Sequence, residues 1–449
     1  MRRYWQFTWC WQRLFRKIEV YLDLRFLIIA ALIAPIGLIC FVKINDDIRW
    51  FWLIILILSF CISALNRYAF SFCILLLLIF GLVLYIDSKY VIEVIKNTTG
   101  KITKINQKSY EITNNHGTYF VIGETSFSLG SIVHVEGKAT DLNDSSFINY
   151  LKSRHVIGVI KQTNHKFISS TFSLKNHIYN YVNSKSNLYS DYTNIFILGK
   201  ITNLDLREKF LQLNIVHLFV ISGFHIYYIN KILCKLLKFK NKDYISLLII
   251  FAYLWLIDFQ IPASKTFLIL LLTKINENFW KQKLSKTVIF LVVVNLFLLY
   301  EVNSVYSLSF ILTFLFSFFI NLINSVKIKE KRWKIVFFWL WINVVSITLN
   351  LYLNNSISLF MIIYNLIYTI IISLVYPVLF LTWWIVPFAE GIYIFFNNSI
   401  NVFNNFNLIL KINQINIWLI YILFSFYSVN LLVLIYWTNK PKYFAYLYI

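Results

Sequence analysis

The stretch NIVHLFVISGFHI (residues 214–226) decides how the rest of the chain is interpreted. It sets His217, Ser222, Gly223 and His225 inside a segment that is otherwise apolar. Hydrocarbon offers no water to an imidazole or a hydroxyl, so such groups normally face the interior of a helix bundle or a water-filled path. A glycine among them lets another backbone or a ligand approach closely. The stretch is therefore a candidate functional site, and its simpler interpretation is a pair of satisfied core histidines.

The composition of the 449-residue chain predicts a polytopic α-helical membrane protein. Hydrophobic residues make up 59% of the chain and charged residues only 14%, whereas a soluble protein carries about 25% charged residues. The mean hydropathy is +0.66. The net charge of +22 fits a nucleic-acid partner, but Lys and Arg also gather on the cytoplasmic loops of membrane proteins. The charge is therefore only weak support for DNA binding.

Apolar and polar stretches divide the chain into parts with different expected roles. These are a basic cytoplasmic N-terminus (1–25), three transmembrane helices (26–86), a soluble domain (87–166), amphipathic surface helices (167–213), a transmembrane core (214–437) and a cytoplasmic tail (438–449). The alternation of basic clusters predicts about eleven crossings of the cell membrane, with both termini cytoplasmic and the soluble domain extracellular. The run 357–396 is too long for one crossing, so a hairpin turning in the Ser373–Pro377 region is expected.

Residues 87–166 alternate between apolar and polar side chains, as half-buried strands do. About five short strands, separated by turn residues, predict a small antiparallel barrel, with an OB-fold as the expected type. OB-folds bind single strands on a basic, aromatic face. The candidate DNA contacts in the barrel are Lys101, Lys104, Lys108, Tyr110 and Tyr119. Core packing is the simpler interpretation of most aromatic side chains in this domain.

Two parts of the chain resemble the ComEC family of competence proteins. The stretch HLFVISGFH (217–225) is similar to the family's HLLAxSGLHV signature, and residues 146–158 resemble the F-x-Y-x-x-Y-L-x-x-x-G-I segment that follows the family's barrel. Looser likenesses place Lys265 where the family has an arginine, and Asn365 in a helix with the pattern S-x-x-x-N-L. The family's Leu-Gly-Asp motif ends in Lys200 here, so the role of that carboxylate does not transfer.

The resemblance, which covers roughly residues 100–390, implies a channel through which single-stranded DNA enters competent bacteria. It also implies a DNA receptor and a cytoplasmic motor ATPase as partners beside the membrane lipids, and it leaves a homo-oligomer open. A path for a polyanion needs water, polar side chains and positive potential. The polar groups expected to line it, or to kink a helix beside it, are His217, Ser222, Gly223, His225, Lys265 and Asn365. The two histidines can share one helix face unless Gly223 bends the helix.

No cofactor, metal or nuclease activity is expected in this chain. Many members of the family continue into a metallo-β-lactamase-like domain with the motif His-x-His-x-Asp-His. The seven histidines here contain no such cluster, so a separate nuclease would have to degrade the second strand. The five cysteines have neither a CxxC nor a Cys/His spacing typical of zinc.

Other functions remain open at this point. A polytopic transporter of a solute or a lipid-linked saccharide, with an extracellular sensor domain, fits the composition and topology equally well. A membrane hydrolase could use His217, Ser222 and His225, although Asp258 is the only carboxylate close to a span in that region. The changes at Lys200 and Lys265 also allow a homologue that has lost DNA uptake.

Overall fold

A computed structural model describes residues 24–43, 49–89, 92–105, 108–138, 145–171, 173–219, 221–279, 281, 283–326, 328, 330–411, 423 and 426–430. The chain divides into two compact units that alternate along the sequence. Unit 1 consists of Met1–Asn176 and Leu268–Ile311, and unit 2 consists of His177–Phe267 and Leu312–Ile449. The expected N-terminus, the end of the expected transmembrane core and the expected tail lie mostly or wholly outside the described residues.

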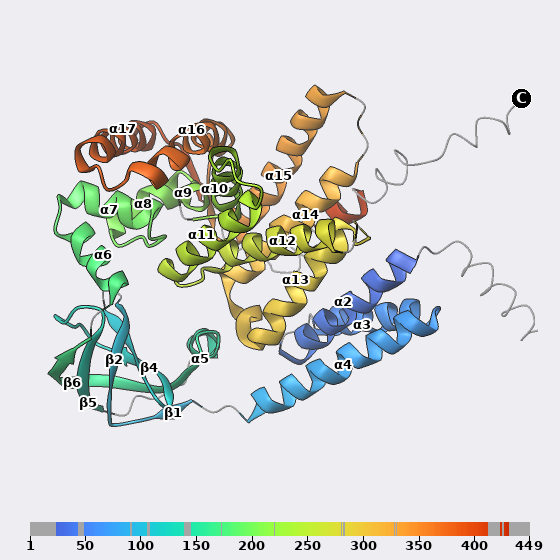
Figure 1. Ribbon diagram of the computed structural model, residues 1–449, viewed down its shortest axis with the longest axis horizontal. Helices are drawn as coiled ribbons and strands as arrows, with labels where there is room; N and C mark the ends of the chain where they lie inside the picture. Colours follow the sequence, from blue (N-terminus) through green and yellow to red (C-terminus); the bar gives the residue numbers. More distant parts are fainter. Residues whose placement is uncertain are drawn as a thin grey trace, which may run out of the picture. The chain divides into compact units, whose positions relative to one another are not determined.

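Most helices of unit 1 coincide with apolar runs of the sequence, and α5 and η1 are the exceptions. Figure 1 shows how the helices are arranged. They are α2 (Leu24–Lys43), α3 (Arg49–Ser63), α4 (Arg67–Ser88), α5 (Ser145–Lys152), part of α12 (Ile261–Asn278), α13 (Lys286–Tyr300), the 3-10 helix η1 (Val302–Tyr306) and the start of α14 (Leu308–Ser325). Polar residues set several boundaries: the side chain of Ser285, for example, accepts a hydrogen bond from Val288 N–H at the start of α13. Asn295 of α13 donates to the carbonyl oxygen of Leu32 at 3.0 Å and so ties α13 to α2.

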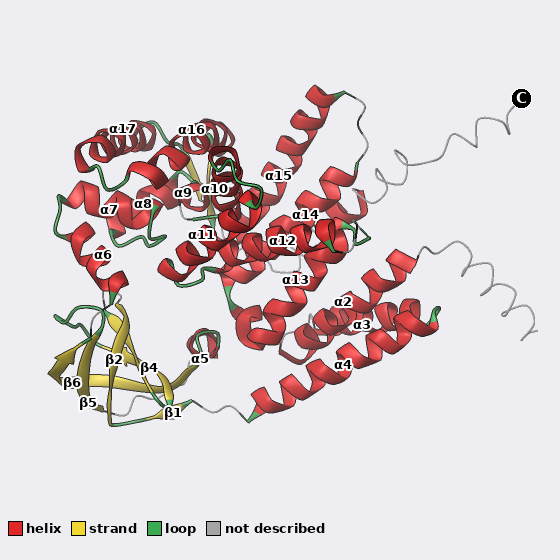
Figure 2. Ribbon diagram, in the orientation of Figure 1, coloured by secondary structure: helices red, strands yellow, loops and turns green. Residues whose placement is uncertain are grey.

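The strands of unit 1 form one body, while most of the other described elements are helical (Figure 2). The strands are β1 (Glu93–Val94), β2 (Asn97–Ile105), β3 (Ser109–Asn114), β4 (Gly117–Ile122), β5 (Ser131–Lys138) and β6 (Val156–Ser170). The order β6-β4-β3-β2-β5 closes on itself through the pairing of β5 with β6, and β1 adds to β6. Closure pairs the edges that an open sheet would expose.

The barrel core is built by alternate residues of these strands. Ile112, Val133 and Val159 are fully buried, and the Asn114 side chain accepts from the backbone N–H groups of His116 and Gly117 at the β3–β4 turn. The expectation of a purely antiparallel barrel is wrong, because β4 and β1 both run parallel to β6. The connection back to a parallel strand is long enough to carry α5, as such crossovers require.

Unit 2 is almost wholly helical in its described part. It contains most of α6 (Leu174–Asn183), α7 (Asn187–Phe196), α8 (Leu204–Gln212), α9 (Val216–Phe219), α10 (Gly223–Leu236), α11 (Lys242–Leu256), the start of α12, the rest of α14, α15 (Lys331–Asn354), α16 (Met361–Thr382) and α17 (Val386–Asn405), with a short ladder of β7 (Ser356–Ser358) and β8 (Ile409–Lys411). Asn203 caps the start of α8, where its side chain accepts a hydrogen bond from Leu206 N–H.

The segment expected to hold only surface helices is partly buried. The second half of α7 lies in the core of unit 2, where Tyr192 and Phe196 stack on Tyr393 of α17 at ring-centroid distances of 5.5 and 6.2 Å. Aromatic residues at three- and four-residue spacing therefore carry this helix into the bundle.

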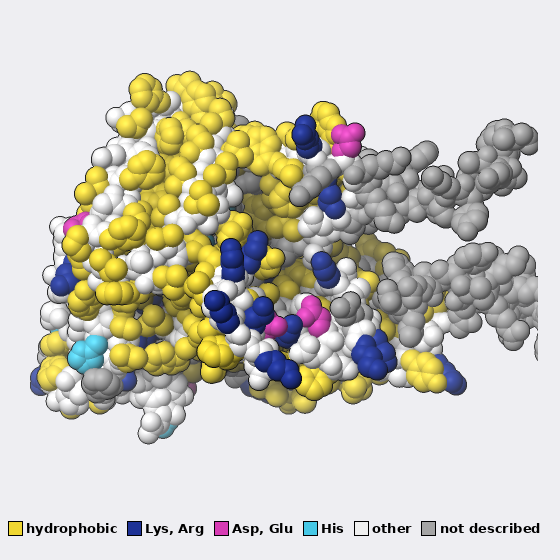
Figure 3. Space-filling model, turned by 45° about the horizontal axis from the view of Figure 1, so that its top comes forward, with side chains coloured by type: hydrophobic (Ala, Val, Ile, Leu, Met, Phe, Trp, Pro, Cys, Tyr) yellow, Lys and Arg dark blue, Asp and Glu magenta, His cyan; other side chains and the backbone are white. Residues whose placement is uncertain are grey.

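Helix α16 shows the inside-out pattern of a membrane helix. Its outward stripe is aliphatic and exposed: Ile363, Leu366, Ile370, Leu374, Val378 and Leu381. Its buried stripe carries polar atoms on Tyr364, Asn365, Tyr368 and Tyr376. Hydrophobic side chains also cover much of the face drawn in Figure 3. An apolar exterior over a polar-containing interior is the arrangement that a lipid environment favours.

Several described helices are suited to crossing a membrane. The long apolar helices are Arg67–Ser88, Arg332–Leu351 and Met361–Thr382, and the segment Val216–Leu236 is as long but is divided between α9 and α10. Shorter apolar helices are Leu27–Lys43, Arg49–Ser63, Lys286–Tyr300 and Leu308–Asn321. The expected hairpin in the run 357–396 exists, but its turn lies at residues 383–385. Pro377 lies inside α16, so the turn expected near it is wrong. The number of crossings remains a prediction.

Candidate functional site

The stretch that opens the transmembrane core is not one continuous helix. After the single turn of α9, Ile221 and Ser222 are non-helical, and α10 begins at Gly223. The backbone N–H of Ser222 donates to Nδ1 of His225 at 2.9 Å, and the Ser222 hydroxyl lies 3.2 Å from the same nitrogen. His225 thus fills the N3 position of a cap, where Glu or Gln usually reaches back to the N-cap backbone.

The geometry around His225 fixes its neutral tautomer. Because Nδ1 accepts a hydrogen bond, the proton of the neutral ring lies on Nε2. His225 is 1% exposed, and Nε2 has no hydrogen-bond partner among the described residues. The ring lies against Tyr376 of α16, with centroids 4.1 Å apart and an interplanar angle of 32°. A buried N–H donor is therefore held rigidly beside an aromatic ring.

Tyr376 continues a buried polar chain toward α7 and α11. Its hydroxyl is 3.1 Å from that of Tyr253, which donates to the carbonyl oxygen of Ile197 at 2.9 Å. Sequence reasoning missed both tyrosines, because the chain holds 29 of them and these two lie unmarked inside apolar runs. Only their position beside Ile197 marks these two tyrosines, and that position is known only from the folded structure.

Gly223 lies where α10 crosses the start of α12. A Cβ atom placed on Gly223 would lie 2.2 Å from Oγ1 of Thr266, a separation that real atoms do not tolerate. Thr266 Oγ1 is itself engaged, since it donates to the carbonyl oxygen of Pro262 at 3.1 Å. The glycine is therefore required by a close helix crossing, which agrees with the small residues common at such contacts in membranes.

Lys265, the residue before Thr266 in α12, is buried. It is 9% exposed, and its Nζ donates to the carbonyl oxygen of Thr313 at 3.4 Å and to the Ser317 hydroxyl of α14. Its Nζ also lies 6.0 Å from the ring centroid of Phe314. Within the described part of the chain, no carboxylate pairs with this ammonium group.

The remaining sequence candidates of the core are placed separately. His217 lies on α9 and is exposed, whereas His225 is buried on α10, so the break between the helices removes the shared face that was expected. Asn365 is 8% exposed on the buried stripe of α16, and its Oδ1 has no partner among the described atoms. The structure thus joins Ser222, Gly223 and His225 but does not bring His217 into their site.

The barrel candidates differ in their surroundings. Tyr110 is fully buried and donates from its hydroxyl to Oε1 of Gln162 at 2.7 Å, and this burial raises its pKa to about 12. The expected DNA contact at Tyr110 is therefore wrong, because no strand can reach its ring. Lys108 is exposed at the β2–β3 loop, while Lys101, Lys104 and Tyr119 are half-buried on β2 and β4.

The basic residue in the altered Leu-Gly-Lys motif has an acidic neighbour. Lys200 Nζ lies 3.4 Å from a carboxylate oxygen of Asp258, which follows α11 in a left-handed backbone conformation (φ +58°). Gln260 donates to the carbonyl oxygen of Gly199 at 2.9 Å and so clasps the same loop. The departure from the family motif is therefore accommodated by an ion pair in this fold.

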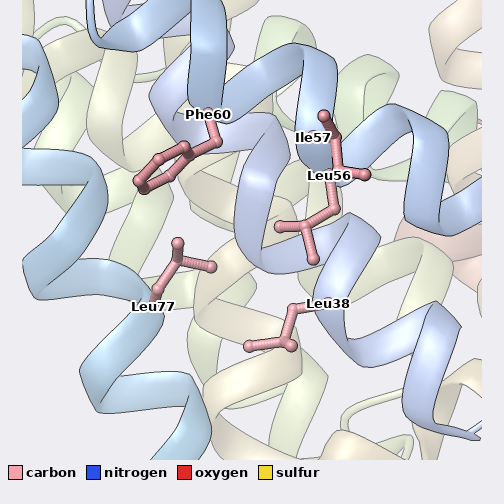
Figure 4. A pocket seen from close by; sticks show the side chains of 5 residues that line it. All are labelled: Leu38, Leu56, Ile57, Phe60 and Leu77. Carbon is pink, nitrogen blue, oxygen red and sulfur yellow. The ribbon is translucent and has the colours of Figure 1, made fainter.

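Other cavities and clusters offer less chemistry. A cavity of about 280 Å³ between α2, α3 and α4 is lined only by Leu38, Leu56, Ile57, Phe60 and Leu77, whose side chains face a common space in Figure 4. A ligand site needs a few convergent polar groups, which this lining lacks. Among the described residues, no three His, Cys, Asp or Glu side chains gather closely enough to hold a metal ion.

Comparison with known proteins gives the chain a family. The family described as "Competence protein" matches residues 198–440, which is more than half of the chain and contains the whole Ser222–His225 site. The uncharacterized protein MG316 of Mycoplasma genitalium is 28% identical over 204 residues, covering 44% of this chain and 52% of that protein. Its homologue from Mycoplasma pneumoniae is 27% identical over 186 residues, covering 41% and 49%.

The chain thus matches about half the length of these curated relatives. No solved structure matches it. The family match and the apolar helices together fit a membrane protein. The chain belongs to the Competence protein family.

Proposed function

We propose that this protein is a channel through which single-stranded DNA crosses the cell membrane during natural transformation. The observation that carries the proposal is Lys265, a buried ammonium group without a carboxylate partner in the described part of unit 2. Burying an unpaired charge is unfavourable, so such groups in membrane proteins usually serve a substrate or an ion. A phosphate of a passing strand supplies the missing negative charge.

The polar atoms left unpaired in the same unit support a wet path. Nε2 of His225, the hydroxyl of Ser264 and Oδ1 of Asn365 are buried and have no hydrogen-bond partner among the described atoms. Buried polar groups are normally satisfied, by protein or by ordered water. Water, or the sugar and base groups of a strand, would satisfy them here. The His225 nitrogen can donate, the Asn365 oxygen can accept and the Ser264 hydroxyl can do both, so together they suit donors and acceptors of a ligand.

We propose that the barrel binds DNA on the side that carries the β2–β3 loop and its exposed Lys108. In OB-type barrels, the second and third strands and the adjoining loops contact oligonucleotides. In this barrel those strands are β3 and β4, and the β2–β3 loop ends at the exposed Lys108. Lys101, Lys104 and Tyr119 complete the proposed surface, from which Tyr110 is left out. An extracellular barrel and cytoplasmic termini fit this direction of transport.

A DNA receptor, a cytoplasmic motor ATPase and a separate nuclease are the proposed partners, and assembly as a homo-oligomer is compatible with the channel. We propose no enzymatic step in this chain. The His225 ring presents its acceptor nitrogen to a backbone N–H group, and no described carboxylate orients its other nitrogen. A serine nucleophile would need both a free base and an orienting group.

The alternative function is transport of a solute or a lipid-linked saccharide. It is compatible with the same helices, but it does not account for Lys265, which has no carboxylate partner among the described residues and lies within the segment that matches the competence family.

The direct test is deletion of the gene followed by measurement of labelled DNA uptake by intact cells. We expect DNA bound at the surface to remain while nuclease-protected DNA inside the cells is lost. Normal uptake in the deletion strain would contradict the proposal.

A second experiment tests the barrel surface. In the complemented strain, the double variant Lys104→Ala, Lys108→Ala should weaken DNA binding. The effect should be largest at low salt, because phosphate contacts weaken as salt rises.

A further inference from the structure

We propose that His155 is a proton-dependent latch that holds the barrel of unit 1 against the helices of the same unit. His155 ends the turn between α5 and β6, with a left-handed backbone conformation (φ +53°). Its Nε2 forms an ion pair with Glu301, which lies between α13 and η1. A left-handed conformation is unfavourable for a residue with a side chain, so its neighbours must hold it in place.

Glu301 is rigidly held on the helical side of the contact. Its side chain is only 9% exposed. Its Oε1 accepts from the backbone N–H of Asn303 at 2.8 Å, which caps η1. The imidazole of His155 therefore docks onto a fixed carboxylate, because Glu301 cannot turn away without uncapping η1.

A second ion pair connects the same cap to two more helices. Lys43, at the end of α2, pairs with Asp87 near the end of α4 and donates to Oδ1 of Asn303 at 2.9 Å. The Asn303 amide nitrogen donates to Asp87 Oδ1 at 2.6 Å, and the hydroxyl of Tyr306 donates to the carbonyl oxygen of Lys43 at 2.8 Å. The latch residue thus meets a network that joins α2, α4 and η1.

Among the four charged groups that these contacts join, protonation of His155 sets two positive charges against two negative ones. Lys43 and protonated His155 then face Asp87 and Glu301. After His155 loses its proton, two mostly buried carboxylates share one lysine. Two other groups face His155. Lys152 on α5 lines, together with His155, a cavity of about 190 Å³. The ring centroid of Tyr300 on α13 lies 6.0 Å from that of the imidazole.

Protons can reach the latch from water. The His155 side chain is 57% exposed, and it lines that cavity together with Asp87 and Glu301. The hydrogen bond to Glu301 raises the pKa of His155 above its usual 6.5, and the charge of Asp87 adds to the rise, while partial burial opposes it. Because the folded-state pKa is raised, the stabilising contribution is complete below about pH 6.5. It is lost as the pH rises through the folded-state pKa.

Hydrogen–deuterium exchange of the full-length protein in detergent tests the latch. The peptides of interest cover residues 145–156 and 301–307, and His155→Gln is compared with the unaltered protein at each pH, so that intrinsic exchange rates cancel. At about pH 5.5 we expect the variant to exchange roughly two- to fivefold faster, the range that a partly exposed ion pair supports. At about pH 8.5 the difference should narrow. An equal gap at both pH values, or no gap at pH 5.5, would overturn the proposal.

Two further variants make the result specific. Glu301→Gln keeps an oxygen that can cap η1 but removes the charge. Although His155 is intact in this variant, the slower exchange of the two peptides at low pH should disappear. His116→Gln, on the β3–β4 turn of the same barrel, should behave like the unaltered protein. Retained pH dependence in Glu301→Gln, or a change in His116→Gln equal to that in His155→Gln, would also overturn the proposal.

Discussion

The backbone N–H of Ser222 donates to Nδ1 of His225 at 2.9 Å, so a histidine caps the helix that begins inside the most distinctive stretch of the chain. A neutral imidazole satisfies a buried N–H group without adding a charge. Glutamate in the same place would bring a negative charge into an apolar bundle. The Ser-Gly-x-His spacing is therefore first a way to start a helix within a membrane segment.

Replacement of His225 separates the cap from the ring. His225→Gln retains an acceptor at N3, so we expect the thermal stability of the detergent-solubilised protein to fall only slightly. His225→Ala loses the cap, worth about 1 kcal/mol, and also leaves a cavity beside Tyr376. Equal loss of stability in both variants would show that the cap contributes nothing.

The crossing of α10 and α12 gives a matched pair of variants. Gly223→Ala forces its new methyl group onto Thr266 Oγ1 and should destabilise the protein by roughly 1–3 kcal/mol, as overpacking does. Thr266→Ala removes the clashing hydroxyl, so the double variant should recover most of that loss. The free energies of unfolding of the two single variants and the double variant measure this coupling. Additive effects would place the two residues out of contact.

Tyr110 predicts the alkaline behaviour of the barrel. Its pKa is raised to about 12 because the buried hydroxyl is disfavoured in its ionised form. Unfolded tyrosine loses its proton near pH 10, so stability falls as the pH rises above 10, by up to about 1.4 kcal/mol per pH unit until pH 12. Tyr110→Phe loses the hydrogen bond to Gln162 and is less stable at neutral pH, but it should lose less stability above pH 10. Parallel pH profiles of the two proteins would contradict this assignment.

The periodic parts of the fold could be predicted from sequence, because burial imposes a period that the residues reveal. The alternation within residues 87–166 predicts short strands on this basis, and the apolar runs predict the apolar helices. The sequence located no strand at β6, because residues 161–166 are polar throughout and show no apolar alternation. The sequence left a bend at Gly223 open, but it did not predict the cap that starts α10, because this cap uses histidine where Glu or Gln is the usual signal.

Proline illustrates the same difficulty. Pro377 lies inside α16, where membrane helices tolerate the missing N–H group, while Pro387 stands in the first turn of α17, the position that proline favours. The residue type proline therefore did not show by itself whether a helix continues or begins at these two positions.

The contacts of the candidate site could not be predicted from the sequence either. Lys265 and Ser317 meet across 52 positions of sequence, and only the packing of α12 on α14 decides that contact.

Lys200, which pairs with Asp258, serves as a control for Lys265, which has no carboxylate partner among the described residues. The side chains of this ion pair are 22% and 48% exposed, so Lys200→Ala should change stability by less than about 1 kcal/mol. We also expect it to leave DNA uptake unchanged, since this lysine already has an acidic neighbour. Loss of uptake in Lys200→Ala at normal protein levels would mean that the altered motif contributes directly to transport.

Uptake of labelled DNA by cells that carry only Lys265→Met tests the channel most directly. Methionine fills similar space without a charge, and replacing a buried charge with an apolar group need not destabilise the fold. The account predicts normal amounts of folded protein in the membrane, a loss of nuclease-protected DNA of roughly tenfold or more, as for a lost bond to a charged group, and substantial recovery in Lys265→Arg. Uptake by Lys265→Met at the rate of the unaltered protein would contradict the claim that this lysine faces the strand.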